Sequence, residues 1–204
     1  MKIQINCITC RAEYSRIQTI KNTWGKHWTD LIFFADFEEG DDVIKTTDNS
    51  TYWGCEEKMV NRFKQIKNKN NYDWYFFIDD DTFVNVSNMV NFVSQLDNNN
   101  AYGYSTTGCL NFPFFQGGAG FFISQKTFNK ITIDSISIKG TGYSDTVACQ
   151  ILKENNINLS FNNDILNSDE AVNLNNEKFK TAITFHKIKT IETMQQYYNC
   201  AYLK

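Results

Sequence analysis

The sequence has no apolar run that approaches the roughly 18 to 20 residues that a transmembrane helix requires, which excludes a membrane bundle. The apolar stretch at the N-terminus is also too short for a signal peptide. Positive charge is not in excess, because the net charge is −3 and the isoelectric point is about 5.4, so no general electrostatic footprint for nucleic acid is present. Six cysteines are too few for a disulfide-built mini-protein and too scattered for a zinc framework.

Proline is almost absent, since Pro113 is the only one in the chain. Cys7 and Cys10 have the spacing of a thioredoxin redox pair. The thioredoxin fold, however, places a cis-proline against that pair, and Pro113 lies in an aromatic loop. Redox chemistry is therefore disfavoured as the function.

What is present is sufficient for one well-buried core. The chain has 204 residues, 42% of them hydrophobic, and no repeat or linker divides it, so a single domain over residues 1–204 is predicted. Short apolar runs alternate with stretches of helical periodicity, which predicts an α/β fold with a mostly parallel central sheet flanked by helices. Strands are predicted at 3–8, 31–35, 74–78, 120–124, 157–161 and 182–185, and helices at 11–24, 59–66, 86–96, 144–153 and 190–198.

Turn and cap signals refine these boundaries. Gly25 is well placed to end the first helix, and Ser87 is a candidate cap for the helix predicted at 86–96. Residues 38–49 are rich in turn formers and are predicted to be a turn-rich segment after the strand at 31–35.

Three consecutive carboxylates, Asp79, Asp80 and Asp81, follow the apolar run at 74–78 directly. In open α/β sheets, ligands bind outside the carboxyl ends of the strands. Neighbouring carboxylates repel one another, and a Mg²⁺ or Mn²⁺ ion shared with substrate phosphates would neutralise them. With Asp80 facing away, Asp79 and Asp81 would serve one metal–diphosphate unit. The alternative is an acidic turn that caps the next helix.

A second class of enzyme has a similar signature. A hydrophobic strand that ends in Asp-x-Asp also opens the haloacid-dehalogenase-type phosphatases. Those enzymes normally have Thr or Val two places after the second aspartate, where this chain has Phe83, and their motif begins near the N-terminus. A phosphatase is therefore the weaker alternative.

Three further segments carry candidate site residues. Gly117 and Gly118 would either expose backbone N–H groups to a ligand or form a tight turn before the next strand. Asp145 begins a predicted helix, where an acid is either a cap or a catalytic group. His186 follows a predicted strand and would complete a metal site begun by Asp81, or serve as a structural hydrogen-bonding group.

An aromatic cluster at residues 112–115, with Tyr102 and Tyr104 nearby, also has two possible interpretations. Its rings would stack on the flat face of a bound ligand, or they would pack in the core. The sequence leaves both open.

Several blocks of sequence follow one another in a definite order: Arg16 with Thr-Trp-Gly-Lys at 23–26, Leu-Ile-Phe-Phe at 31–34, Tyr-Asp-Trp-Tyr-Phe-Phe-Ile-Asp-Asp-Asp-Thr-Phe-Val at 72–84, Gly-Gly-Ala-Gly-Phe at 117–121, Ser-Asp-Thr-Val-Ala at 144–148 and Ala-Ile-Thr-Phe-His-Lys at 182–187. In this order they resemble the β1,3-glycosyltransferases of the Fringe and core-1 galactosyltransferase type (family 31), over nearly the whole chain. The resemblance implies a GT-A nucleotide-sugar transferase fold that uses a UDP-sugar and Mn²⁺, or Mg²⁺, and inverts the anomeric carbon.

The resemblance also implies roles for individual residues. Asp81 and His186 match the metal ligands of the family, and Asp145 matches its catalytic base. The chain departs from the family pattern at Ser144, where an acidic residue usually precedes the base, and at Cys149, where glycine is common.

The remaining matches concern the donor. Asp79 falls near the ribose or the diphosphate, and Asp80 beside it is counted among the donor-binding residues. Thr9 and Arg16 fall in the first strand–helix region, where such enzymes hold uridine. Gly117 and Gly118, named above, fall where the donor-sugar or acceptor pocket is lined.

The predicted function is therefore an inverting, metal-dependent transfer of a hexose or N-acetylhexosamine from a UDP-sugar to a hydroxyl of a glycan acceptor, with a β1,3 linkage implied by the resemblance. The alternatives are the phosphatase and a catalytically silent UDP-sugar-binding module, which the change at Ser144 leaves open. The expected compartment is the cytoplasm of the host cell if Met1 is the native start, and the Golgi lumen if an N-terminal anchor has been removed.

Overall fold

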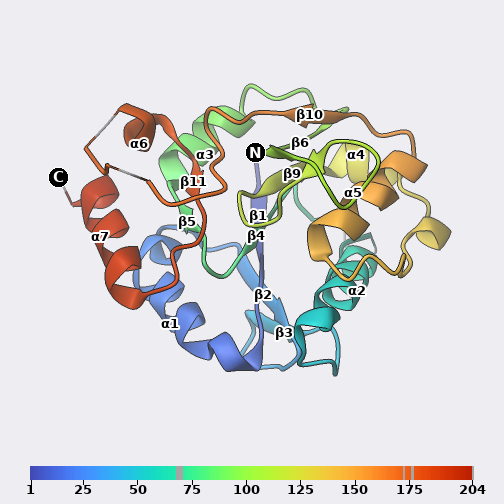
Figure 1. Ribbon diagram of the computed structural model, residues 1–204, viewed down its shortest axis with the longest axis horizontal. Helices are drawn as coiled ribbons and strands as arrows, with labels where there is room; N and C mark the ends of the chain where they lie inside the picture. The colour runs from blue at the N-terminus through green and yellow to red at the C-terminus, as the bar shows by residue number, and fades with distance from the viewer. Residues whose placement is uncertain (68–70, 172, 176, 204) are drawn as a thin grey trace.

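A central mixed sheet organises the computed structural model, which describes residues 1–67, 71–171, 173–175 and 177–203 (Figure 1). Its strand order is β10-β6-β9-β4-β1-β2-β3, and all neighbours are parallel except β9, which runs antiparallel to β4 and β6. The predicted α/β fold with a mostly parallel sheet is confirmed. The strands of this sheet are β1 (Ile3–Ile8), β2 (Leu31–Ala35), β3 (Val43–Lys45), β4 (Trp74–Asp79), β6 (Ala101–Gly103), β9 (Phe121–Ser124) and β10 (Leu159–Phe161).

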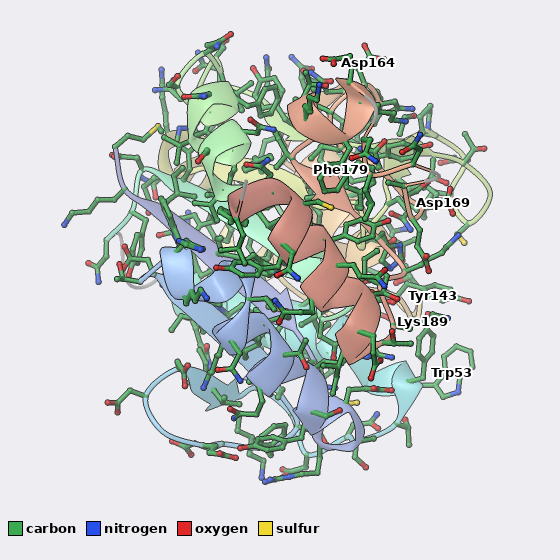
Figure 2. All side chains as sticks on the ribbon, turned by 90° about the vertical axis from the view of Figure 1, so that its left-hand side faces the viewer. Trp53, Tyr143, Asp164, Asp169, Phe179 and Lys189 are labelled. Atoms are coloured by element: carbon green, nitrogen blue, oxygen red, sulfur yellow. The ribbon has the colours of Figure 1, made fainter. Side chains whose placement is uncertain are left out.

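Helices cover both faces of the sheet. On one face lie α1 (Tyr14–Asn22), α3 (Val86–Val93) and α7 (Ile191–Tyr202), with α1 and α7 side by side in Figures 1 and 2. On the other face lie α2 (Cys55–Lys67), α4 (Gln125–Lys130) and α5 (Ser144–Glu154), and α2 packs along α5. The remaining helical segments are α6 (Glu177–Thr181), η1 (Arg11–Glu13), η2 (Trp24–His27), η3 (Tyr52–Gly54) and η4 (Ile133–Ser135). Within the described part of the chain, no helix combines the length and the hydropathy needed to cross a bilayer.

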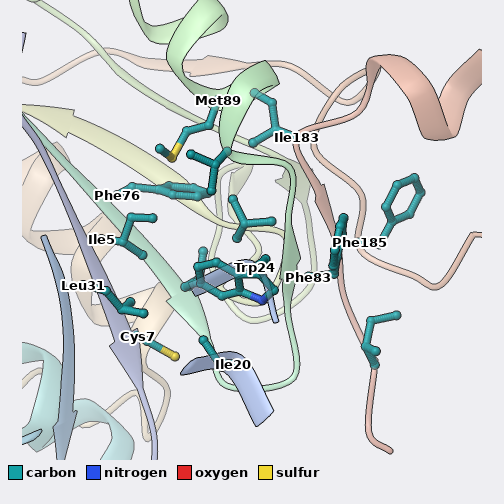
Figure 3. Packing of buried hydrophobic residues seen from close by; sticks show 14 of the residues in the cluster. Ile5, Cys7, Ile20, Trp24, Leu31, Phe76, Phe83, Met89, Ile183 and Phe185 are labelled. Carbon is teal, nitrogen blue, oxygen red and sulfur yellow. The ribbon is translucent and has the colours of Figure 1, made fainter. Parts of the chain in front are cut away.

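The double cover explains why the central strands are apolar at almost every position. Successive side chains of a strand point to opposite faces, so Phe76 packs in the core beneath α1 and α3, and Phe77 packs in the core beneath α2 and α5. Figure 3 shows Phe76 in the first of these cores with Ile5, Trp24 and Met89, all of which are buried.

Aromatic pairs fix the register of the antiparallel strand β9 on β4. Phe76 lies opposite Phe122 with ring centroids 3.9 Å apart, and Phe77 lies opposite Phe121 at 5.0 Å. Such pairs contribute about 0.5–1.5 kcal/mol beyond the burial of their surface. Because β9 is antiparallel, this register brings the glycine segment that precedes it to the carboxyl end of β4.

Two small sheets lie outside the main one. β5 (Phe83–Val84) pairs antiparallel with β11 (Thr184–Phe185), and β7 (Ser105–Thr106) pairs antiparallel with β8 (Phe114–Phe115). Phe114 and Phe115 are buried, so in that part of the aromatic cluster the core-packing interpretation holds.

The ends of some helices and strands differ from the predictions where two neighbouring residues could both serve as a cap or a helix end. Helix α3 is capped by Asn85, whose side chain accepts the backbone N–H of Asn88, so the expectation that Ser87 is the cap is wrong. The predicted first helix divides into η1 and α1, and Gly25 falls in η2, just after the end of α1. The turn-rich segment 38–49 also contains a short strand, β3, at the edge of the sheet.

Candidate functional site

The site lies where β1 and β4 end side by side. Ile8, the last residue of β1, is in register with Asp79, the last residue of β4. The side chains that follow each strand, Thr9 on one and Asp80 and Asp81 on the other, therefore meet at one edge of the sheet. This edge is where parallel α/β sheets bind ligands.

The β5–β11 pair brings a histidine from far along the chain to this edge. Phe185 lies opposite Phe83, and the backbone N–H of Ile188 donates to the carbonyl of Asp81 at 2.8 Å. His186, which immediately follows β11, is thereby held beside Asp81. Two short strands thus fix the distance between residues that the sequence separates by about half its length.

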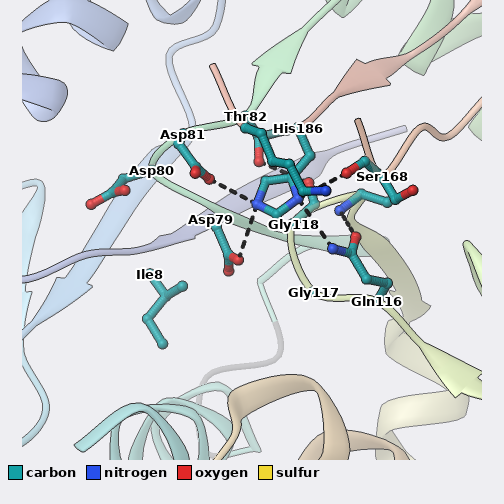
Figure 4. Close-up of polar contacts among 12 residues, drawn as sticks. Ile8, Asp79, Asp80, Asp81, Thr82, Gln116, Gly117, Gly118, Ser168 and His186 are labelled. Atoms are coloured by element: carbon teal, nitrogen blue, oxygen red, sulfur yellow. Dashed lines mark hydrogen bonds and ion pairs between the residues drawn. The ribbon is translucent and has the colours of Figure 1, made fainter. Parts of the chain in front are cut away.

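Asp79, Asp81 and His186 form a compact group of potential metal ligands (Figure 4). His186 Nε2 lies 2.9 Å from an oxygen of Asp81 and 3.8 Å from an oxygen of Asp79, and the three ligand atoms all lie within 4.8 Å of one another. On the other side of the ring, Nδ1 lies 3.3 Å from the carbonyl oxygen of Ser168. A proton on Nδ1 donated to that carbonyl leaves Nε2 free as a ligand.

The charges at this group are poorly balanced without a cation. Burial raises the pKa of Asp79 to about 7, and the carboxylates of Asp81, Asp145 and Asp80 act in the same direction against the opposing effect of His186. Burial acts on Asp81 in the same way, but its hydrogen bond to His186 and the charge of that ring outweigh burial and lower the pKa of Asp81. Two carboxylates and an imidazole are a donor set that suits Mn²⁺, and such an ion would offset the mutual repulsion of the two carboxylates. The residues present therefore fit a divalent ion.

Asp80 points to a different set of partners. One of its carboxylate oxygens accepts a hydrogen bond from the Thr9 hydroxyl at 2.6 Å, and the other lies 2.8 Å from Arg16 Nη1. Its carboxylate therefore joins the end of β1 and helix α1 to the acidic triplet. The interpretation that the middle aspartate faces away from the outer two agrees with this arrangement.

Asp145 lies in the first turn of α5, where backbone N–H groups meet it. One carboxylate oxygen accepts from the N–H of Gly117 at 3.0 Å, and the other accepts from the N–H of Thr146 at 2.7 Å. Burial nevertheless raises the pKa of Asp145 above its ordinary value, because those hydrogen bonds compensate only part of the lost solvation.

Two successive glycines allow the acid and the histidine to come close to the same loop. A Cβ at Gly118 would lie 2.1 Å from His186 Nε2, a distance that no side chain can occupy without displacing the ring. A Cβ at Gly117 would lie 3.3 Å from Asp145 Cβ, a tight contact but one that a small shift would relieve. The close approach is the reason for glycine at position 118, since its φ is not in the left-handed region.

A cavity of about 640 Å³ opens over this edge of the sheet. Of the candidate site residues from the sequence, the glycines at 117 and 118 contact its wall residues Asp145 and His186, and the others line it: Thr9, Arg16, Asp79, Asp80, Asp81, Asp145 and His186. A volume of this size is within the range of small-molecule sites.

Sequence reasoning missed residues that support this wall. Lys58 is 1% exposed, donates to the carbonyl of Thr9 at 2.9 Å and lies 3.6 Å from a carboxylate oxygen of Asp36. Gln116 accepts the N–H of Ala119 with its amide oxygen at 2.6 Å. Its amide nitrogen lies 3.1 Å from His186 Nδ1, which is no hydrogen bond in the tautomer whose Nδ1 proton is donated to Ser168. A lysine inside the apolar stripe of α2 is the one signal that would have marked Lys58 in advance, and Gln116 carries none.

Glu56 is a further missed residue, and it supports the loop before α5. Its buried carboxylate accepts three backbone N–H groups, from Lys139 at 2.5 Å, Gly140 at 3.0 Å and Gly142 at 2.7 Å. We expect Glu56→Gln to lower the free energy of unfolding by about 1.5–3 kcal/mol, because an amide has one acceptor oxygen and no charge for these donors. Urea denaturation measures the change.

The neighbouring Glu57→Gln is the matched control, since Glu57 lies on the same helix and is only half-buried. If both variants lose the same stability, the three backbone hydrogen bonds of Glu56 do not have the importance assigned to them.

The sequence of the chain is similar to those of known glycosyltransferases. A sequence model of the Fringe-like family matches residues 2–161. A mouse (Mus musculus) β-1,3-glucosyltransferase is 24% identical over 139 residues, and this match covers 62% of the chain but only 28% of that relative's length.

Solved structures of glycosyltransferases share the fold. A glycosyltransferase involved in the glycosylation of the major capsid of PBCV-1 superposes with a TM-score of 0.61 at 15% identity and covers 97% of this chain and 98% of that one. The galactosyltransferase LgtC, in complex with donor and acceptor sugar analogues, gives 0.54 at 10% identity and covers 97% and 95%. The bifunctional glycosyltransferase WbbM gives 0.59 at 10% identity and covers 96% and 49%. The fold is thus the GT-A fold of nucleotide-sugar transferases.

Proposed function

We propose, because the chain belongs to the Fringe-like family, that it is an inverting glycosyltransferase. It would move a hexose or N-acetylhexosamine from a UDP-sugar to a hydroxyl of a glycan and form a β1,3 linkage. One observation carries the proposal: the group of Asp79, Asp81 and His186 shares a single cavity with Asp145, so a metal-bound donor and a general base would face the same bond.

Asp81 and His186 would hold Mn²⁺, or Mg²⁺ in its place, with Asp79 beside them toward the diphosphate. The ion would supply Lewis-acid stabilisation of the negative charge that develops on the leaving diphosphate. Cationic side chains line the same cavity, with Arg16 on α1 and Lys187 and Lys189 just after β11. They would bind and orient the phosphates.

Asp145 would act on the acceptor. Its carboxylate takes the proton of the attacking hydroxyl as that oxygen bonds to the anomeric carbon, while the bond from this carbon to the diphosphate breaks and UDP leaves with the electron pair. Attack on the face opposite the leaving group inverts the anomeric carbon. One carboxylate suffices for this displacement, since no covalent sugar–enzyme intermediate is formed.

The test is UDP release in the presence of Mn²⁺ with a panel of UDP-sugars, each measured with and without free glycans as acceptors. The proposal predicts release that acceptor glycans stimulate and that a chelator abolishes. A haloacid-dehalogenase-type phosphatase would instead release inorganic phosphate from small esters without an acceptor. A catalytically silent module would bind UDP with Mn²⁺ and release nothing, and either of these results would contradict the proposal.

The pH dependence of transfer follows from the base. Asp145 must be ionised to accept a proton, and burial raises its pKa above the value of about 3.9 for an ordinary aspartate. We therefore expect kcat/KM for the acceptor to fall as the pH drops through this raised pKa, so that the acidic limb lies above the range of an exposed carboxylate. Initial rates at saturating Mn²⁺ and donor, from pH 4 to pH 8, measure the limb, and an identical limb in Asp145→Asn would assign it to another group.

A further inference from the structure

Three aromatic side chains gather at the rim of the cavity. Tyr52 and Trp53, in η3, are 65% and 66% exposed, and Tyr143 immediately precedes α5. The ring centroids of Tyr52 and Tyr143 are 6.0 Å apart, those of Trp53 and Tyr143 are 6.5 Å apart, and those of Tyr52 and Trp53 are 6.1 Å apart. Tyr52 and Tyr143 line the cavity, and Figure 2 shows Trp53 and Tyr143 at the same edge of the molecule, with Trp53 projecting outward. Large apolar rings so exposed at a cavity call for a ligand that covers them.

The loop before α5 contacts the side chain of Trp53. Its ring packs against the backbone of Gly142, where a Cβ would lie 3.0 Å from two of the ring carbons. The N–H of Gly142 in turn donates to Glu56, on the helix that follows Trp53. The ring therefore contacts the chain at Gly142 and is otherwise largely exposed to solvent. An aromatic group held in this way loses little conformational entropy when a ligand stacks on it.

The exposed side chains of the cavity wall fall into two parts by their chemistry. The buried Lys58 of α2 also lines the cavity, but it contacts Thr9 and Asp36. Arg16 and Lys189, with their positive charge, come from α1 and from the segment before α7, which belong to one face of the sheet (Figure 1). Tyr52 and Tyr143 come from the segments before α2 and α5, which belong to the other face. A diphosphate requires the cationic part, whereas the C–H face of a pyranose ring fits aromatic rings.

The aromatic part is also the part next to the base. Ser144 alone separates Tyr143 from Asp145, and Tyr52 and Asp145 line the same cavity. A sugar ring stacked on the aromatic side chains would present its hydroxyls toward the Asp145 carboxylate. A UDP-sugar whose diphosphate is held by the cationic part would bring its anomeric carbon to the attacking hydroxyl from the opposite side.

We propose that Tyr52, Trp53 and Tyr143 form the acceptor subsite, and that its occupant is a pyranose ring of a neutral glycan that stacks its apolar C–H face on these rings. This inference rests on the proposed function and adds to it the residues that select the acceptor. Trp53 contributes most because its ring is the largest and is already oriented by Gly142.

The experiment compares the wild-type protein with Trp53→Ala, Trp53→Phe and Tyr143→Ala. The acceptor probes are methyl glycosides of galactose, N-acetylglucosamine, N-acetylgalactosamine and fucose, which have no aromatic group of their own. With the methyl glycoside that the wild type uses best, Trp53→Ala should raise the acceptor KM by about tenfold, as expected for the loss of an aromatic stacking partner. The KM for the UDP-sugar should stay at the wild-type value. Trp53→Phe should have an acceptor KM between those of the wild type and Trp53→Ala.

Ile133→Ala is the matched control, because Ile133 is a large apolar side chain, 49% exposed, in η4. The neighbouring Thr132 donates its N–H to Asn155 at the C-terminal end of α5, whereas Tyr143 precedes the N-terminal end of that helix. If no methyl glycoside accepts sugar, saturation-transfer NMR of the same glycosides, recorded with UDP and Mn²⁺ present, reads binding directly. There the signal should weaken in Trp53→Ala and persist in the control.

Two results would overturn the inference alone. One is an acceptor KM, or a saturation-transfer NMR signal, that is the same in Trp53→Ala as in the wild type. The absence of any glycoside NMR signal with the wild-type protein would overturn the inference in the same way. The other is a rise in the KM for the UDP-sugar instead, which would place the nucleotide on these rings. A failure of the proposed function has a different signature, namely no release of UDP from any UDP-sugar by the wild-type protein with Mn²⁺.

Discussion

Replacing Asp145 by asparagine should slow sugar transfer by about 10²–10⁴-fold, which is the usual contribution of a general base. Asparagine has the same shape as aspartate, and its amide oxygen can still accept the N–H of Gly117 that meets Asp145 at 3.0 Å. What it cannot do is take a proton from the acceptor hydroxyl. The loss should therefore appear in kcat for transfer, whereas the affinity for Mn²⁺ and UDP should change little. Steady-state kinetics and a binding titration on the same preparation separate the two effects.

Asp134→Asn provides the control for this variant, since Asp134 is exposed and lies in η4, outside the cavity lining. Both variants should stay folded at the assay temperature, with Asp145→Asn somewhat less stable because its amide nitrogen would face the N–H of Thr146. Transfer that continues at the wild-type rate in Asp145→Asn would show that another group, or water, accepts the proton.

The second large effect is expected from the smallest change, Gly118→Ala. The added methyl group would meet His186 Nε2 at 2.1 Å, so the ring must leave its place beside Asp81. The backbone of Gly118 is not in the left-handed region, so alanine adds no conformational strain of its own. Misplacing a metal ligand typically costs about 10- to 100-fold in metal affinity or activity, and we expect a loss of at least this size in Mn²⁺ affinity. Titration of the free Mn²⁺ signal by electron paramagnetic resonance measures it.

Gly117→Ala is the comparison that makes this result specific. Its methyl group would approach Asp145 Cβ at 3.3 Å and touch the proposed base instead of the histidine. Gly117→Ala should thus keep most of its Mn²⁺ affinity even where transfer slows. If the two variants bind Mn²⁺ equally well, the steric account of the glycine pair is wrong.

The central strands were within reach of sequence reasoning, because they are buried on both faces and therefore read as continuous apolar runs. Asp79 could be placed at the carboxyl end of such a run for the same reason, since it ends β4. Elements that depend on a distant partner were not predictable in this way. The strands β5 and β11 have two residues each, too few for a periodic signal, and only their mutual pairing defines them.

Side-chain contacts across the fold were the hardest to foresee. An Asn85 cap and a Ser87 cap look alike in sequence, and only the backbone conformation of the folded helix decides between them. The aromatic residues that drew attention, Phe114 and Phe115, turned out to be buried, while the exposed ring of Trp53 gave no signal. Exposure is a property of the packed chain, and composition alone does not reveal it. The role of Glu56 could not be predicted from the sequence either, because its hydrogen-bond partners are backbone groups more than 80 residues away.

The proposed transfer requires above all a divalent ion held jointly by Asp81 and His186 in the presence of the nucleotide. The direct measurement is the dissociation constant of Mn²⁺ with UDP present, for the wild type, His186→Ala and Asp81→Asn, with His27→Ala as the control because His27 is the other histidine of the chain and is exposed. Mn²⁺ binding should weaken by at least about tenfold in the two site variants and stay at the wild-type value in His27→Ala. Equal Mn²⁺ affinity in all four proteins would contradict this expectation.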